Sequence, residues 1–142
     1  MAAPQFTSAA EFREVMDRVF TLMSEDPEMG PRLRDADVPQ RFEFTDLDEV
    51  VNIRAARPGE PGNLTWVWSD DVDWEPKVRM TMSSETANRF FQGRENVALA
   101  IARRRIKTGG DVKAALALIP ITKPVHAGYR AMLADEYPHL VV

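Results

Sequence analysis

Residues 90–118 read FFQGRENVALAIARRRIKTGGDVKAALAL, and this stretch decides the fold. Phe90 and Phe91 end an amphipathic helix at Gly93, a residue that readily adopts the left-handed conformation that closes a helix. Asn96 follows closely and is a residue type that caps helix N-termini. The stretch therefore predicts one helix that ends at Gly93 and a second that begins after Asn96.

The second half of the stretch changes periodicity twice. Val97 and Ile101 are spaced to face inward from a helix, and residues 103–107 then alternate as a short strand would. Residues 109–111 break that strand, and Asp111 is placed to cap the next helix. We therefore expect helix, turn, helix, basic strand, glycine pair and helix in succession.

This succession resembles the sterol carrier protein 2 (SCP2) family. The family signature is an aromatic-ended helix, a Gly-Lys pair, an Asn, a helix with alanine, a Lys-hydrophobic-Lys strand, and Gly-Asp or Gly-Asn opening a helix rich in alanine and leucine. The matching positions are Gly93, Arg94, Asn96, Ala100, Arg105, Ile106, Lys107, Gly110, Asp111 and residues 114–118.

Two positions depart from the family pattern. Arg104 stands where the family usually has Gly in the turn from helix to strand, and a left-handed turn at a non-glycine residue costs about 1 kcal/mol. Arg94 replaces the usual Lys and keeps its charge.

The resemblance implies both a fold and a function. The fold is α+β, with a five-stranded, mostly antiparallel sheet and helices packed on one face. Residues 1–142 would form a single SCP2-like lipid-binding domain, a small stand-alone member of the bacterial type. Its implied function is that of a non-catalytic intracellular carrier that holds a fatty acyl or sterol-like ligand in an apolar tunnel between sheet and helices.

The rest of the chain agrees with that order of elements. Ser8 opens a capping box, and the apolar residues behind it recur at helical spacing. Period-two alternation predicts four strands in the neighbourhood of residues 41–45, 50–55, 64–68 and 77–82. Pro120 is expected to stop one helix and Pro124 to start the last one.

Composition suits one soluble domain, with 142 residues and 44% hydrophobic content. The absence of cysteine excludes disulfides, a thiol nucleophile and the usual zinc clusters. No apolar run approaches the ~20 residues that cross a bilayer, and the N-terminus lacks the pattern of a secretory leader. We expect a cytoplasmic protein.

Charge is unevenly distributed along the chain. Residues 1–76 contain seven Arg and 17 acidic residues, whereas residues 77–130 contain 11 Lys or Arg and three acidic residues. The basic half is compatible with transient contact to an anionic membrane surface. The competing interpretation, which sequence alone favours, is a solvated surface balanced by the acidic half.

Other chemistries find little support in the sequence. The acidic residues between Asp70 and Glu75 lack an EF-hand pattern, and His126 and His139 have no metal-binding spacing, so we expect no metal site. No nucleophile motif or phosphate loop is present, and we expect no catalytic residues and no cofactor. Strand alternation would split residues 103–105 between two faces of an acidic chain, which argues against nucleic acid as a partner.

Apolar residues of the predicted sheet and helices are the candidate ligand site. Periodicity alone favours a filled core over a hollow one, and the resemblance to SCP2 reverses that preference. A polar mouth is expected near Gln92, Arg94 and Asn96, with the last helix, residues 122–135, as a movable lid. The candidate ligand-binding residues are Trp66, Trp68, Met80, Met82, Phe90, Phe91, Gln92, Val97, Ile101, Leu116, Ile119, Tyr129, Met132 and Leu133.

Two alternatives to a carrier stay open. The first is an interaction or accessory domain with a filled core, which forms a homodimer or supports a partner enzyme. The second is an enzyme acting on a lipid in the pocket with Asp or Glu as base, for which a carboxyl group with a raised pKa would be needed.

Overall fold

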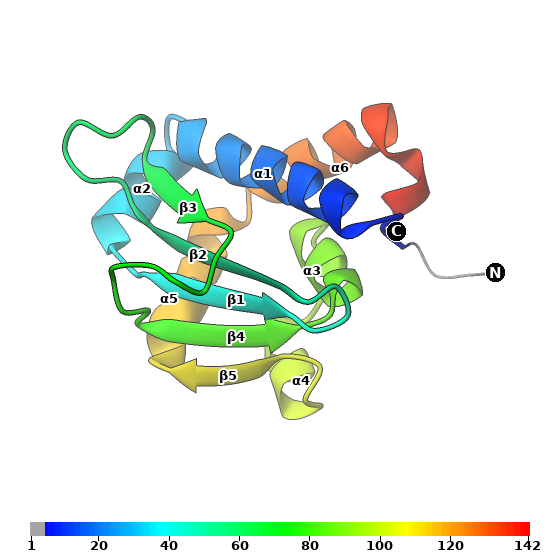
Figure 1. Cartoon of the computed structure of the whole chain (residues 1–142). Coiled ribbons are helices and arrows are strands. Elements are labelled where there is room, and N and C mark those ends of the chain that lie inside the picture. The colour runs from blue at the N-terminus through cyan, green and yellow to red at the C-terminus, as the bar shows by residue number, and fades with distance from the viewer. Residues whose placement is uncertain (1–4) are drawn as a thin grey trace.

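The computed structural model describes residues 5–142 and shows one layer of helices against one sheet (Figure 1). The helices are α1 (Ala9–Glu25), α2 (Met29–Ala36), α3 (Ser84–Phe91), α4 (Val97–Ala102), α5 (Val112–Thr122) and α6 (Val125–Glu136), followed by the short 3-10 turn η1 (Pro138–Leu140). The strands are β1 (Gln40–Phe44), β2 (Glu49–Ala55), β3 (Leu64–Val67), β4 (Val78–Met82) and β5 (Lys107–Gly110).

Within the described residues the strands form a single mixed sheet in the order β3-β2-β1-β4-β5. Three pairings are antiparallel, and β1 pairs with β4 in parallel, with Phe42 opposite Met80. The parallel pair arises because the long connection after β3 returns the chain to the other side of β1. The α+β prediction is confirmed, and the sheet is mixed because of this one crossing.

Side-chain caps fix the starts of four helices, three of them at the residues predicted above and the fourth at Ser83, one of two adjacent serines that could cap α3. The Ser8 hydroxyl accepts from the Glu11 amide at 3.0 Å, and the Ser83 hydroxyl accepts from the Thr86 amide at 3.1 Å. The remaining two caps are Asn96 on the Leu99 amide and Asp111 on the Ala114 amide, each at 3.0 Å. Each such cap satisfies an amide that the helix leaves unpaired and contributes about 1 kcal/mol.

The predicted strand at residues 103–107 is wrong in its bounds. The amides of Arg105 and Ile106 both donate to the Ala100 carbonyl, so residues 103–106 close α4 instead of extending. Strand β5 starts at Lys107 and includes the glycine pair that was expected to end it. Gly110 is required there, because a Cβ atom would lie 2.4 Å from the Lys77 carbonyl oxygen.

Pro120 does not stop the helix, contrary to expectation. Helix α5 continues through it to Thr122, with Pro120 itself exposed. Proline has no amide hydrogen, so α5 lacks the bond that residue 120 would donate to the Leu116 carbonyl.

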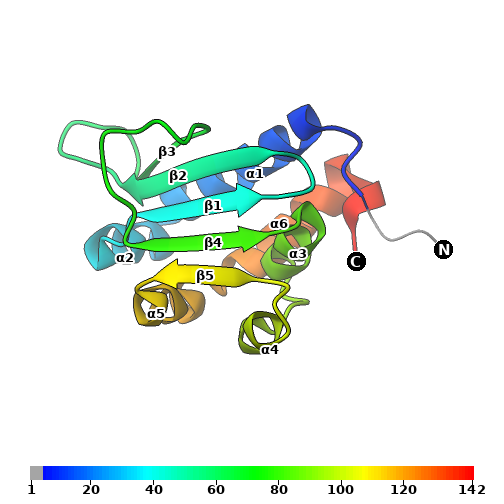
Figure 2. The same cartoon turned by 60° about the horizontal axis from the view of Figure 1, so that its bottom comes forward.

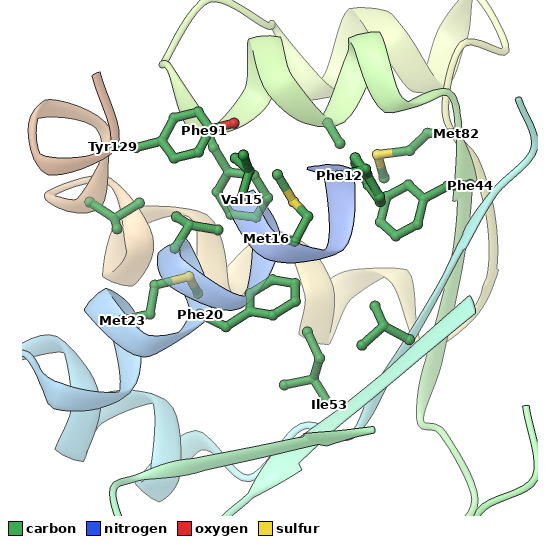
Figure 3. Packing of buried hydrophobic residues seen from close by; sticks show 14 of the residues in the cluster. Phe12, Val15, Met16, Phe20, Met23, Phe44, Ile53, Met82, Phe91 and Tyr129 are labelled. Carbon is green, nitrogen blue, oxygen red and sulfur yellow. The ribbon is translucent and has the colours of Figure 1, made fainter. Parts of the chain in front are cut away.

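The helices gather on one face of the sheet (Figure 2). Helix α1 occupies the centre of the core and contacts α2, α6 and β3 (Figure 3). Its side chains Phe12, Val15, Met16 and Val19 are completely buried. This central position of α1 determines which part of the sheet is left for a cavity.

Candidate functional site

An apolar cavity of about 70 Å³ lies between the sheet and the helices. Strands β1, β2, β4 and β5 form one wall, and α3, α4 and α5 form much of the opposite wall. The lining residues are Phe20, Met23, Leu33, Gln40, Phe42, Phe44, Ile53, Met80, Met82, Ala87, Phe90, Phe91, Val97, Ile101, Ile106, Thr108, Val112, Ala115, Leu116, Leu118, Ile119 and Thr122.

The lining is chemically simple. Gln40, Thr108 and Thr122 are its polar side chains, and no lining side chain ionises near neutral pH. The Thr122 hydroxyl already donates to the Ile119 carbonyl at 3.1 Å. A space lined in this way favours hydrocarbon.

Helix α5 covers the cavity and forms its exposed edge. It supplies Val112, Ala115, Leu116, Leu118, Ile119 and Thr122, more lining residues than any other helix or strand. Leu116 is 39% exposed, and Ile119 and Ile101 are partly exposed beside it. The cavity is thus reached from the surface past α5 and α4.

The structure brings eight of the predicted site residues together at this cavity. Two come from β4, two from α3, two from α4 and two from α5. Their role in ligand binding stays a prediction. The eight residues are Met80, Met82, Phe90, Phe91, Val97, Ile101, Leu116 and Ile119.

Trp66 and Trp68 lie elsewhere, beneath α1. Both indole nitrogens donate to the Asp17 carboxylate on α1, at 2.9 and 2.7 Å. The Trp66 ring packs edge-on against Phe20 at 5.6 Å between centroids. Both tryptophans face the helix layer, as a spacing of two along one strand predicts, but α1 covers this end of the sheet and fills the space that a ligand would need.

Gln92 is not a residue of an open mouth. Its side chain is completely buried, donates to the Leu140 carbonyl at 2.9 Å and accepts from the Val142 amide at 2.9 Å. Asn88 joins the same network, donating to the Leu140 carbonyl at 2.8 Å and accepting from the Tyr129 hydroxyl at 2.8 Å. These polar groups fasten the C-terminal segment to α3, and burial raises the pKa of the Tyr129 phenol.

The other two expected mouth residues also lie off the cavity. Arg94 and Asn96 are both exposed and absent from its lining. The Asn96 side chain is occupied as the cap of α4.

Helix α6 does not lie over the cavity as a lid. Tyr129, Met132 and Leu133 are buried where α6 contacts α1 and α3, and none of them lines the cavity. The predicted lid is therefore misplaced by one helix, since α5 has the covering position.

Sequence reasoning missed several lining residues. Period-two spacing could have identified Ile53 and Thr108, which lie at inward positions of their strands. Helical spacing could have identified Phe20 and Met23, which belong to the buried stripe of α1. Phe42 and Phe44 line the cavity as strand alternation predicts for the floor of an apolar pocket. The lining residues that were not expected are Phe20, Met23, Leu33, Gln40, Ile53, Ala87, Ile106, Thr108, Val112, Ala115, Leu118 and Thr122.

Within residues 5–142, no group of three or more His, Cys, Asp or Glu side chains converges to hold a metal ion. Over the same residues, none of the helices has both the length and the apolar character to traverse a bilayer.

Glu60 lies in the loop between β2 and β3. Hydrogen bonds from the Arg54 side chain and the Arg57 amide lower the pKa of Glu60 to about 2.

Comparison with known proteins identifies the fold. No family model matches the sequence, and no curated protein does. The solved structure of UbiJ-SCP2, a ubiquinone synthesis protein, matches with a TM-score of 0.60 and 6% identity over 85% of this chain and 95% of that chain. Sterol Carrier Protein 2 from Yarrowia lipolytica, in its apo form, matches with a TM-score of 0.53 and 15% identity over 88% of this chain and 96% of that chain. The chain has the SCP2 fold.

The same fold occurs as part of a much longer chain. The stereoselective inverting sec-alkylsulfatase Pisa1 from Pseudomonas sp. matches with a TM-score of 0.61 and 17% identity over 75% of this chain. The matched part is only 16% of the sulfatase chain.

Proposed function

We propose that this chain, which has the SCP2 fold, is a non-catalytic carrier that binds a fatty acyl or sterol-like molecule in the cavity beneath α5. The observation that carries the proposal is the lining, which is apolar except for Gln40, Thr108 and Thr122 and has no ionisable group. The SCP2 structures that it resembles support the same reading. Burial of hydrocarbon would supply the affinity, at about 0.8 kcal/mol per methylene removed from water.

Binding requires the cavity to widen. Its volume of about 70 Å³ is well below the ~300–1,000 Å³ that is typical of ligand pockets. Helix α5 is the element best suited to move, because it covers the cavity, lacks one backbone hydrogen bond at Pro120 and exposes Leu116 at its edge. A displacement of α5 away from β4 would open the space without disturbing the buried network on α3.

A fluorescent fatty acid tests the proposal. Titration with cis-parinaric acid should give a saturable rise in polyene fluorescence at one equivalent, because the chromophore leaves water for the cavity. Saturating probe should also stabilise the protein, by about 2.7 kcal/mol at a hundredfold excess over Kd. The proposal fails if fluorescence rises without saturation and the melting temperature does not change.

A second candidate is an accessory domain that dimerises or supports an enzyme. The small cavity favours it, as does the match to one part of the sulfatase chain. Such a domain would keep α5 closed, bind no fatty acid and form a stable complex with its partner or with a second copy.

A further inference from the structure

A second hollow, here called the basic groove, opens at the end of β4. It has a volume of about 680 Å³ and lies between α3, the turn that closes α4, and the start of β5, elements that meet at one end of the sheet in both views (Figures 1 and 2). Its lining residues are Thr45, Thr81, Met82, Ser83, Glu85, Thr86, Arg89, Glu95, Arg103, Arg104, Arg105 and Lys107.

Positive charge dominates the basic groove. Glu95, whose side chain is only 4% exposed, is held by Arg105 at 2.6 Å and Arg89 at 3.4 Å. Among residues 5–142, no carboxylate lies within 4.0 Å of Arg103, Arg104 or Lys107. Among the lining residues of the basic groove, the exposed Glu85 is the carboxylate left to oppose these three cations.

Arg104 occupies a backbone position that glycine would adopt at lower cost. Its φ of 59° is left-handed, and such a conformation costs a non-glycine residue about 1 kcal/mol. The conformation directs the chain through the tight closure of α4 and places a fourth guanidinium in the lining of the basic groove, beside those of Arg89, Arg103 and Arg105. Local strain of this kind is typical of functional sites.

The α3 N-terminus does not supply the anion site by itself. The Ser84 amide donates to Asp46 at 2.8 Å and the Thr86 amide donates to Ser83 at 3.1 Å, so both are already satisfied. Attraction for an anion must therefore come from the arginine and lysine side chains.

The basic groove adjoins the apolar cavity. Met82 lines both spaces and separates them with a flexible thioether side chain. Two pairs of residues adjacent in the chain also lie at this boundary. Ala87 and Ile106 line the cavity, and their neighbours Thr86 and Lys107 line the basic groove. A molecule with a hydrocarbon tail and an anionic head would fit both spaces if Met82 changed rotamer.

We propose that the basic groove binds the phosphate-type head group of an amphiphile whose tail lies in the apolar cavity. The inference rests on the proposed function, since the tail needs the cavity. Arg103, Arg104 and Lys107 carry more positive charge than the carboxylate head of a fatty acid would neutralise. When the opposing charge of Glu85 is counted, the charge that remains matches a doubly charged phosphate monoester. Guanidinium groups also bind phosphate oxygens in pairs, which adds directional strength.

Three probes separate the head from the tail. Calorimetric titrations below the micellar concentration would use dodecyl phosphate, 1-dodecanol and inorganic phosphate. Wild-type protein should bind dodecyl phosphate about tenfold more tightly than 1-dodecanol, as expected for charge-assisted hydrogen bonds in a partly exposed groove. Inorganic phosphate should compete weakly with dodecyl phosphate and leave dodecanol binding unchanged.

The Arg104→Gly variant separates binding from folding. It removes one guanidinium and relieves the left-handed backbone, so the preference for dodecyl phosphate should fall while the melting temperature stays equal or rises. Lys107→Gln should lower the same preference through charge alone. Arg32→Gln, which removes an exposed arginine of α2 outside the groove, should change neither property.

The outcomes distinguish this inference from the proposed function. Equal wild-type affinities for dodecyl phosphate and 1-dodecanol would overturn the head-group site and leave the carrier proposal intact. An unchanged preference in both Arg104→Gly and Lys107→Gln would do the same. Failure of both dodecyl compounds to bind would overturn the carrier proposal and the shared site together, and saturable inorganic phosphate binding would then assign the groove to a free phosphate compound.

Discussion

Replacement of Ala115 by Leu is expected to weaken cis-parinaric acid binding by about tenfold or more. Ala115 lies on the inner face of α5 and lines the cavity, so a leucine side chain would occupy space that the ligand needs. Forcing extra methylenes into an occupied site costs about 1–3 kcal/mol, and 1.4 kcal/mol corresponds to a tenfold change in Kd. The measurement is the fluorescence titration, performed in parallel with wild-type protein.

The unliganded Ala115→Leu protein should be about as stable as wild type. Its added carbons enter a cavity of about 70 Å³, where burial gains of about 0.8 kcal/mol per methylene offset local strain. Ala117→Leu makes the same chemical change on the exposed side of α5 and serves as the matched control. Equal probe affinities for the two variants would show that the ligand does not occupy the space beneath α5.

Replacement of Asn88 by Ala should lower the free energy of unfolding by about 3 kcal/mol. The Asn88 side chain accepts from Gln92 at 3.0 Å and from the Tyr129 hydroxyl at 2.8 Å, and donates to the Leu140 carbonyl at 2.8 Å. Truncation would leave the buried Tyr129 hydroxyl without its acceptor, and each unsatisfied buried group costs about 1–3 kcal/mol. Urea unfolding measures the change.

Tyr129→Phe is the matched control for this network. It removes only the hydroxyl, and the Asn88 oxygen keeps its bond from Gln92, so a loss of about 1 kcal/mol is expected. If Asn88→Ala cost no more than Tyr129→Phe, the polar network would not be what fastens the C-terminal segment to α3.

Local signals in the sequence predict most of the secondary structure. Ser8, Asn96 and Asp111 cap their helices as expected, because capping depends on residues three positions apart. The left-handed backbone at Arg104 agrees with the resemblance to SCP2, whose members usually have Gly at this turn. The errors at residues 103–107 and at Pro120 arise where backbone bonds to Ala100 and helix packing override local propensity.

The location of the cavity could not be predicted in the same way. Period-two spacing correctly places Trp66 and Met80 on the helix-covered face of the sheet, but it does not say which helix covers which strand. Helix α1 covers Trp66 through Asp17, whereas α5 lies over Met80, and this partition decides which residue lines the cavity. The role of Gln92 depends on the C-terminal segment, 48 residues away at Leu140, which no local pattern reveals.

Native mass spectrometry with one equivalent of palmitic acid tests the central claim most directly. We expect the wild-type protein to carry a single molecule of the acid per chain and Ala115→Leu to carry little, because the ligand lies beneath α5. A wild-type spectrum without the adduct, above all with a peak at twice the subunit mass, would contradict the carrier function and favour the accessory domain.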